Sequence, residues 1–327
     1  MIKFDRAGLG ETMKKPIFYL ALSAGLLGAC SEQGGQAGKI GQPVAASAPQ
    51  SAASDRHYAP RQADTAKPED LLQQFVWHTE QVRPRLQQAA PEEADRLYET
   101  HKEMLEHYDG QTEKSGLLDR LSHEQKPFLD HYHDDANWIT NSDTGVRKPV
   151  PALKKKQEEM AAIGLEYVDM YDGPAIIRAE PDYYRKLFAG KVSPDYARFI
   201  ELEAQERRDP SWGEADVIVG WPELGKRLAA REAFTRQFPQ SRLFAQMKEQ
   251  HMYYQYMFLL GMENTLAFDS EGKRPRPEVA EAWQDFAEHH PESPTTALIR
   301  QMGNQDYEQA LKTVQAAQKQ YFGRPAF

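Results

Sequence analysis

The sequence predicts a mainly α-helical protein of packed antiparallel helical hairpins, with one small β-hairpin near residues 165–179. From about residue 68 onward, apolar residues recur every three or four positions, which is the spacing of one helix face. Proline followed by acidic residues marks several helix starts. The β-hairpin is the exception, because strand-forming residues flank the strong turn signal Asp172-Gly173.

The first two helices are expected over residues 68–86 and 91–108, as an antiparallel pair. Pro84 removes a backbone donor and should kink or end the first helix late in its course. Gly110 is expected to stop the second helix. Their apolar faces comprise Leu72, Phe75, Val76, Val82 and Leu86 in the first helix, and Leu97, Tyr98, His101, Met104, Leu105 and Tyr108 in the second.

The next stretch predicts two further helices. A short helix covers Leu117 to Leu121, and Pro127 opens another that runs to about Trp138. Residues 141–151 are rich in turn formers and are expected to be a loop. This loop marks the expected boundary between an N-terminal helical unit, residues 68–140, and a helical domain, residues 150–327, that carries the β-hairpin as an insertion.

The β-hairpin follows a helix over residues 154–162. Its strands are residues 165–171 and 174–179, and Pro174 weakens the second strand because it lacks a backbone donor. A lone hairpin is marginal in water, so it must lie on helices. Helices are then expected over residues 181–189 and 193–208, with Ser193 as N-cap, while residues 216–220 form an apolar run of undetermined type.

Near the C-terminus the chain almost repeats itself. Phe234, Pro239 and Ser241 recur 52 residues later as Phe286, Pro291 and Ser293. Each set lies where proline ends one helix and serine caps the next. Over about the last hundred residues this resembles tetratricopeptide-type helical repeats, although the period is longer and the Trp-Leu-Gly-Tyr pattern is missing. The resemblance implies paired helices, which we expect without membership of that family.

Between the two copies lies the most apolar stretch of the body, Met252 to Met262. It is apolar almost all round, which is typical of a central core helix. An aromatic groove that carries a small apolar ligand is the alternative. The last helices are expected over residues 295–302 and 306–321.

The composition excludes some classes of protein. The net charge is −9, which argues against nucleic-acid binding. Cys30 is the only cysteine, so the chain forms no internal disulfide and its stability must come from packing. From about residue 69 there is enough chain for one large domain or two small ones.

The N-terminus carries a sorting signal. Met13-Lys14-Lys15 is a short basic region, and an apolar segment over residues 16–26 leads to Leu27-Gly28-Ala29-Cys30. This order resembles the bacterial lipoprotein signal, or lipobox. The resemblance implies that a peptidase recognises Leu27, Gly28 and Ala29, that residues 1–29 are removed, and that Cys30 carries the lipid.

Two details refine this signal. Residues 1–12 contain Asp5 and Glu11, which do not suit a basic region, so we expect Met13 to be the true start and residues 13–29 to be the signal. Ser31 follows the cysteine where an aspartate commonly retains Gram-negative lipoproteins at the inner membrane. By resemblance, the chain is expected at the outer membrane, with its body facing either the periplasm or the exterior.

Residues 30–67 are expected to form a disordered linker that starts at the lipidated cysteine. They are rich in Gly, Ala, Ser, Gln and Pro and have few large apolar side chains. A flexible chain of this length has a root-mean-square reach of about 30–40 Å. The linker would hold the body off the membrane without fixing its orientation.

The best metal candidates are His123, His131, Asp134 and Asp135. On a helix, the last three would share one face, and imidazole and carboxylate groups suit zinc. A solvated polar helix face is the other interpretation of this pattern. His101 and His251 fall on apolar faces, where a hydrogen-bonded core histidine is expected. No spaced catalytic or nucleotide-binding motif is present, and no cofactor is expected.

These observations favour a non-enzymatic, membrane-anchored envelope lipoprotein whose helical body binds or scaffolds another protein. Its expected partners are the membrane, through lipidated Cys30, and an envelope protein. Two alternatives stay open. One is an envelope hydrolase or metal-dependent enzyme that uses residues 123–135, and the other is a carrier of a small apolar ligand near residues 252–262.

Overall fold

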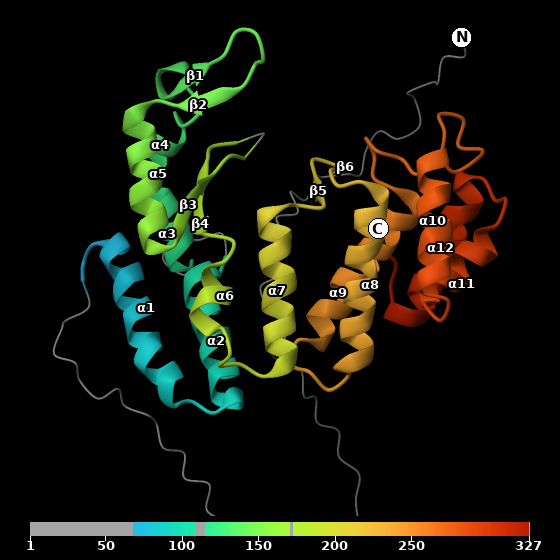
Figure 1. Cartoon of the computed structure of the whole chain (residues 1–327), viewed down its shortest axis with the longest axis horizontal. Helices are drawn as coiled ribbons and strands as arrows, with labels where there is room; N and C mark the ends of the chain where they lie inside the picture. Colours follow the sequence, from blue (N-terminus) through green and yellow to red (C-terminus); the bar gives the residue numbers. More distant parts are fainter. Residues whose placement is uncertain (1–67, 109–114, 171–172, 327) are drawn as a thin grey trace, which may run out of the picture.

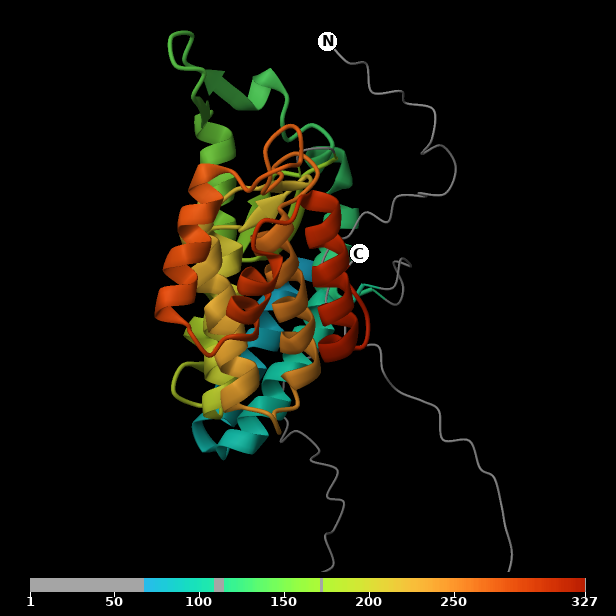
Figure 2. The same cartoon turned by 90° about the vertical axis from the view of Figure 1, so that its right-hand side faces the viewer.

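A computed structural model describes residues 68–108, 115–170 and 173–326. Within these ranges the protein has twelve α-helices and three two-stranded antiparallel sheets, which confirms the predicted fold class. The longer helices lie side by side in a row, with α1 at one end and α10, α11 and α12 at the other (Figure 1). Figure 2 views this row from the α10–α12 end.

The row begins with α1 (Leu71–Gln88) and α2 (Pro91–Glu106), which are the expected first pair. The Asp70 carboxylate accepts a hydrogen bond from the Gln73 backbone N–H at 2.8 Å and caps α1. α1 continues through Pro84 to Gln88, so the proline does not end the helix. Pro84 lies close to the C-terminus, and the inward face continues beyond it with buried Leu86.

After α3 (Leu117–Glu124), the chain departs from the expected order. α4 (Lys126–Leu129) is a single turn, and a 3₁₀ turn (Asp135–Asn137) then leads into β1 (Trp138–Thr140). The predicted helix from Pro127 to Trp138 is therefore wrong beyond Leu129. The side chains of Asn137 and Trp138 donate to the carbonyls of His131 and Tyr132, each at 2.7 Å, and so stabilise a non-helical path.

The predicted loop over residues 141–151 is also partly wrong. β2 (Arg147–Pro149) pairs with β1 in an antiparallel register of Trp138 with Pro149 and Thr140 with Arg147. Pro151 then begins the next helix. The β1–β2 hairpin projects beyond the ends of the helices in both views (Figures 1 and 2).

The β-hairpin predicted near residues 165–179 is confirmed. α5 (Pro151–Ile163) ends at Gly164, whose φ of 89° turns the chain into β3 (Leu165–Val168). β3 pairs antiparallel with β4 (Ile176–Ala179), and Pro174 stays outside the ladder. The hydroxyl of Ser122 on α3 accepts from the Ile177 backbone N–H at 3.0 Å, which fixes this hairpin on the helices as expected.

The middle of the row contains α6 (Tyr183–Phe188) and α7 (Pro194–Arg208). Ser193 stands at the N-cap of α7, but its hydroxyl donates to Asp195 and makes no cap bond. Its backbone N–H donates to Asp95 of α2 at 2.9 Å. The undetermined run at residues 216–220 begins in the short hairpin of β5 (Trp212–Gly213) and β6 (Asp216–Val217).

The C-terminal part consists of paired helices. Its elements are α8 (Trp221–Gln237), α9 (Phe244–Leu260), α10 (Pro277–His289), α11 (Pro294–Met302) and α12 (Tyr307–Phe322). α8 packs on α9, α10 packs on α8, and α12 packs on α9, so helix pairing is confirmed. Ser293 caps α11 as predicted, while Ser241 accepts from the Leu243 backbone N–H, one residue before α9 begins.

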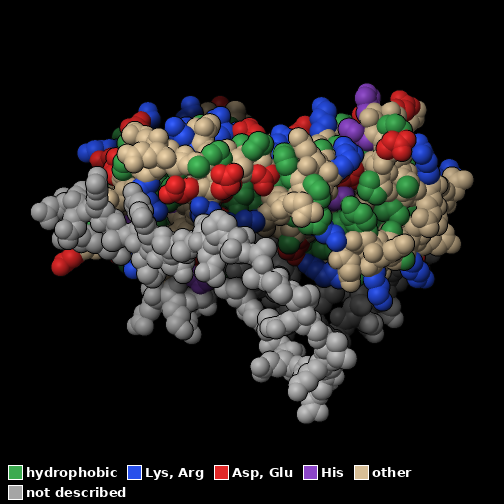
Figure 3. Space-filling view, turned by 90° about the horizontal axis from the view of Figure 1, so that it is seen from below, with side chains coloured by type: hydrophobic (Ala, Val, Ile, Leu, Met, Phe, Trp, Pro, Cys, Tyr) green, Lys and Arg blue, Asp and Glu red, His purple; other side chains and the backbone are tan. Residues whose placement is uncertain are grey.

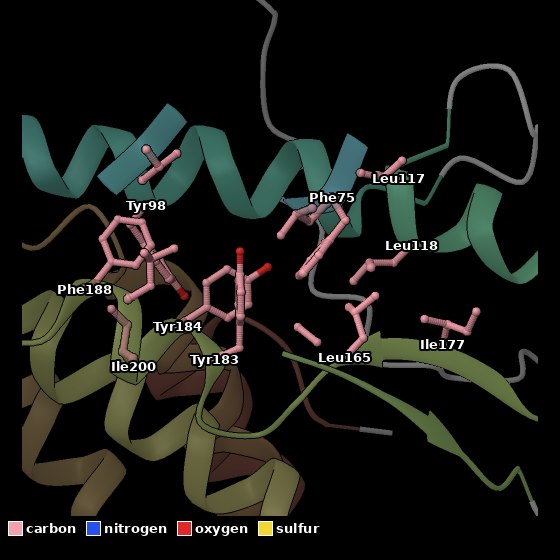
Figure 4. Packing of buried hydrophobic residues seen from close by; sticks show 14 of the residues in the cluster. Phe75, Tyr98, Leu117, Leu118, Leu165, Ile177, Tyr183, Tyr184, Phe188 and Ile200 are labelled. Atoms are coloured by element: carbon pink, nitrogen blue, oxygen red, sulfur yellow. The ribbon is translucent and has the colours of Figure 1, made fainter. Parts of the chain in front are cut away.

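The buried apolar side chains form two clusters. The first joins α1–α7 and the β3–β4 hairpin with Phe234 of α8 and Met247 of α9. It includes Tyr98, whose ring packs edge to face on those of Tyr184 and Phe188 (Figure 4). It contains residues from both sides of the loop expected at 141–151, such as Tyr132 and Leu153. The second cluster fills the space between α8, α9, α10, α11 and α12.

The apolar stretch from Met252 to Met262 lies largely in α9, which is a core helix as expected. Tyr254, Met257 and Phe258 are buried in the second cluster. The Phe258 ring lies 5.2 Å from that of Phe286, and the indole of Trp283 donates to the Phe258 carbonyl at 2.8 Å. Neighbouring side chains therefore occupy the surroundings of this helix.

Candidate functional site

Helix α1, the edge helix of the row, carries one broad apolar face. Phe75, Val82 and Leu86 point inward and are buried in the first cluster. Leu72 and Val76 lie one turn apart at the edge of this face, where Leu72 packs against the first cluster and Val76 is 39% exposed. The exposed edge of the apolar face is therefore available for another contact.

This edge of α1 forms one wall of a surface groove with a volume of about 510 Å³. Its apolar lining comes from Leu72, Val76 and Trp77 of α1 and from Ile163. Ile163 is the last residue of α5, so two elements distant in the sequence build the groove.

Polar groups border the groove along α1. Gln73, Glu80 and Gln81 contribute to its lining, and Glu80 forms an exposed ion pair with Arg83 at 3.0 Å. The groove-lining residues of α1 form two adjacent rows along the helix, one of positions 72, 76 and 80 and one of positions 73, 77 and 81. An apolar floor between such rows fits the apolar side of another helix.

The charged surface elsewhere is mixed. Figure 3 shows basic and acidic side chains interspersed over the face seen from below. Many ion pairs on the described surface join residues only three or four apart in the sequence, such as Lys126 with Asp130. Such exposed pairs contribute little to stability, so the polar groups that hold the fold lie inside it.

The first internal polar group joins α1, α2 and α6. His101 Nε2 lies 2.8 Å from the Tyr183 hydroxyl, which lies 2.7 Å from the Thr79 hydroxyl. His101 is 3% exposed, and burial lowers its pKa to about 4, with a smaller contribution from His78. The predicted core histidine with a hydrogen-bond partner is confirmed. Its seclusion prevents it from meeting a substrate in solution.

A second group fixes α2 against α7. Arg207 donates two hydrogen bonds of 2.8 Å to Glu106, and Lys102 donates to the same carboxylate at 2.5 Å. Burial alone would raise the pKa of Glu106, but these two cations outweigh it and hold the pKa well below its usual value. A carboxylate in this state stays charged and cannot act as a general acid.

The third group lies between α7, α8 and α9 and was missed from the sequence. Arg227 and Arg231 are almost fully buried, and Glu206 lies within 4 Å of both guanidinium groups. Arg231 stacks on the Tyr254 ring at 3.5 Å, and Tyr254 also donates to Glu206. Positions 227 and 231 fall on the apolar face of α8, and two arginines at such positions are a signal that could have indicated the cluster.

The fourth group contains His251, the second predicted core histidine. His251 is 1% exposed, and its Nε2 lies 3.3 Å from Glu232 Oε1. Thr295 donates to the same oxygen at 2.5 Å. A nucleophilic hydroxyl must bond to its base. Here the Thr295 hydroxyl and the His251 imidazole both contact the Glu232 carboxylate, so the three residues are not arranged in the order of a catalytic triad.

The four metal candidates are not brought together. His123 pairs with Asp119 at 4.0 Å, His131 with Asp134 at 3.0 Å, and Asp135 with Arg147 at 3.5 Å. They separate because the chain leaves the helix at Leu129, so the shared helix face does not form. Across residues 68–108, 115–170 and 173–326, no three His, Cys, Asp or Glu side chains form a metal-binding group.

The residues of the lipobox, Leu27, Gly28, Ala29 and Cys30, lie outside the described residues. No helix in the described part is long and apolar enough to cross a membrane. No family model, curated protein or solved structure matches the chain. The groove on α1 is therefore interpreted from its own geometry.

Proposed function

We propose that the chain is a lipid-anchored lipoprotein of the bacterial outer membrane whose body binds an apolar helix of another envelope protein in the α1 groove. The exposed edge of the apolar face of α1 carries the binding proposal. Leu72, Val76, Trp77 and Ile163 give the groove an apolar floor, and a volume of about 510 Å³ accommodates several side chains. The lipobox supports the anchor.

The anchor is tested at Cys30. Cys30→Ala removes the thiol that would accept the lipid, so we expect loss of labelling by a fatty-acid probe and release from the membrane fraction. Ser31→Ala leaves the thiol in place and is the matched control. A Cys30→Ala chain that keeps its label would contradict the anchor.

The groove is tested by site-specific photocrosslinking in cells. A photoreactive residue at Val76 should give a discrete adduct with one envelope protein, while the same residue at exposed Tyr321 of α12 should not. Adding Leu72→Glu places a charge on the groove floor and should remove the Val76 adduct. Adducts that form equally at both positions, or that survive Leu72→Glu, would refute binding in this groove.

A further inference from the structure

A second surface groove lies on α12, at the opposite end of the helix row from α1 (Figure 1). It has a volume of about 460 Å³. Three cationic side chains, Lys312, Lys319 and Arg324, contribute to its lining. We call it the basic groove. No role for it follows from the fold, because the packed face of α12 carries Ala310, Val314 and Gln318 instead.

The backbone places the three cations side by side. Lys312, Ala316 and Lys319 are spaced four and three residues apart, so they share one exposed face of α12. Gly323 ends the helix with a φ of 91°, which returns the chain along α12 and brings Arg324 to the groove. The Ala326 backbone N–H donates to Gln318 Oε1 at 2.9 Å and anchors this return.

The groove is more positive than the chain as a whole, whose net charge is −9. Arg324 pairs with Glu249 of α9. Among the described residues, neither Lys312 nor Lys319 has a carboxylate within ion-pair distance, although Glu308 lies one turn before Lys312. Lys248, 5.6 Å from the Tyr321 ring, adds a further cation at this end of α12. The basic groove therefore has positive charge that the fold does not neutralise.

We infer that the basic groove binds the phosphate groups of an anionic lipid surface. The inference rests on the proposed anchor, because a chain of 37 residues between Cys30 and Pro68 keeps the body near the membrane. The body, residues 68–327, has 32 Lys and Arg against 44 Asp and Glu, a net charge of −12, so an anionic surface repels it and its basic region decides which end approaches.

The length of the linker permits this orientation. Fully extended, 37 residues span up to about 130 Å. Neighbouring helices pack about 8–10 Å apart, so even ten of them side by side would measure roughly 80–100 Å, less than this span. The α12 end can therefore touch the membrane although the linker joins the body at α1. Helix α1, which carries the other groove, lies at the opposite end of the row from α12 (Figure 1).

The test uses vesicle binding by the full chain with Cys30→Ser, which has no lipid of its own. Each lysine or arginine near an anionic surface strengthens binding about fivefold. We expect binding to vesicles of phosphatidylglycerol, a much weaker signal with phosphatidylcholine, and a decline with added salt. The double variant Lys312→Gln/Lys319→Gln should bind about 25-fold more weakly.

The matched control is Lys154→Gln/Lys155→Gln, which changes the net charge equally. These lysines are exposed on α5 and lie 3.6 and 3.8 Å from Glu158 and Glu159, so their loss should leave vesicle binding unchanged. Circular dichroism should show both double variants folded, since all four side chains are at the surface.

If both double variants bound vesicles equally weakly, binding would depend on net charge alone and the assignment would be overturned. Failure of the Cys30→Ser chain to bind anionic vesicles would also overturn it. Saturation of the groove by inorganic phosphate without vesicle binding would assign it to a soluble ligand and also overturn the lipid assignment. Because this chain lacks Cys30, the vesicle result does not depend on whether the cell lipidates the protein. Failure of the anchor is therefore distinguishable from failure of the basic groove.

Discussion

The buried imidazole of His101 makes a quantitative prediction about stability and pH. Its pKa is lowered to about 4 in the folded protein, while a histidine in the unfolded chain titrates near its ordinary value of 6.5. Between these two values the unfolded chain binds more protons than the folded one, so stability falls as the pH falls. From pH 7.5 to pH 4.5, this one group should cost about 2.5 kcal/mol of unfolding free energy.

The substitution His101→Gln removes the titration and keeps a side chain that can bond to Tyr183. Urea unfolding of the purified Cys30→Ala chain, followed by circular dichroism at both pH values, gives the unfolding free energies with and without His101→Gln. The decrease on acidification should be about 2.5 kcal/mol larger with His101 present. Acidic groups such as Glu106 contribute equally to both chains and cancel in this comparison.

His131→Gln is the matched control. His131 is 71% exposed in its side chain and pairs with Asp134 on the surface, so its loss should leave the unfolding free energy nearly unchanged. If His101→Gln loses as much free energy between pH 7.5 and pH 4.5 as the chain with His101, the assignment of a neutral, buried imidazole is refuted.

Three further substitutions test the packing through thermal and urea unfolding. Gly261→Ala should lower the unfolding free energy by about 3 kcal/mol or more, because φ is 81° and the new Cβ would lie 2.2 Å from the Thr265 carbonyl oxygen. Its control is Gly145→Ala, which has open space around it and should lower the unfolding free energy by only about 1–2 kcal/mol. Ser293→Ala should cost about 1 kcal/mol through loss of the α11 cap, and a change near zero would contradict that role. Arg227→Met should cost about 1–3 kcal/mol, because Ser211 and the Asp209 carbonyl lose a buried donor and Glu206 keeps Arg231 as its cation, whereas exposed Arg83→Met should cost below about 1 kcal/mol.

Local sequence signals predicted the elements where they agree with packing. Proline at the starts of α2 and α7, and serine before α11, mark helix beginnings that the structure keeps. The hairpin at residues 165–179 was predictable because strand formers flank a turn signal. The pairing of α8 with α9 followed from the proline and serine positions of the near-repeat.

The segment after Leu129 was mispredicted because non-local contacts decide it. Its polar residues suit a helix surface, but side-chain bonds to the carbonyls of His131 and Tyr132 favour turns and a strand. The metal hypothesis depended on that helix, so it failed for the same reason. Periodicity could not reveal the α1 groove, because Ile163 joins Leu72 and Val76 only through the tertiary fold.

The buried arginines show another limit of sequence reasoning. Arg227 and Arg231 belong to an apolar face only if their charges are matched inside the fold, and their partner Glu206 lies on a different helix. Pattern rules place such residues on the surface by default. Their partners become visible only when α7, α8 and α9 are assembled.

Helix α8 belongs to both apolar clusters. Trp221, Leu224 and Leu228 pack in the second cluster, whereas Phe234 packs in the first. Because both clusters pack on α8, unfolding of one cluster would remove part of the packing of the other. The body should therefore unfold in a single cooperative transition. Fragments cut on either side of α8 would expose apolar surface and aggregate, and a protease that opens this helix would inactivate the α1 groove and the basic groove together.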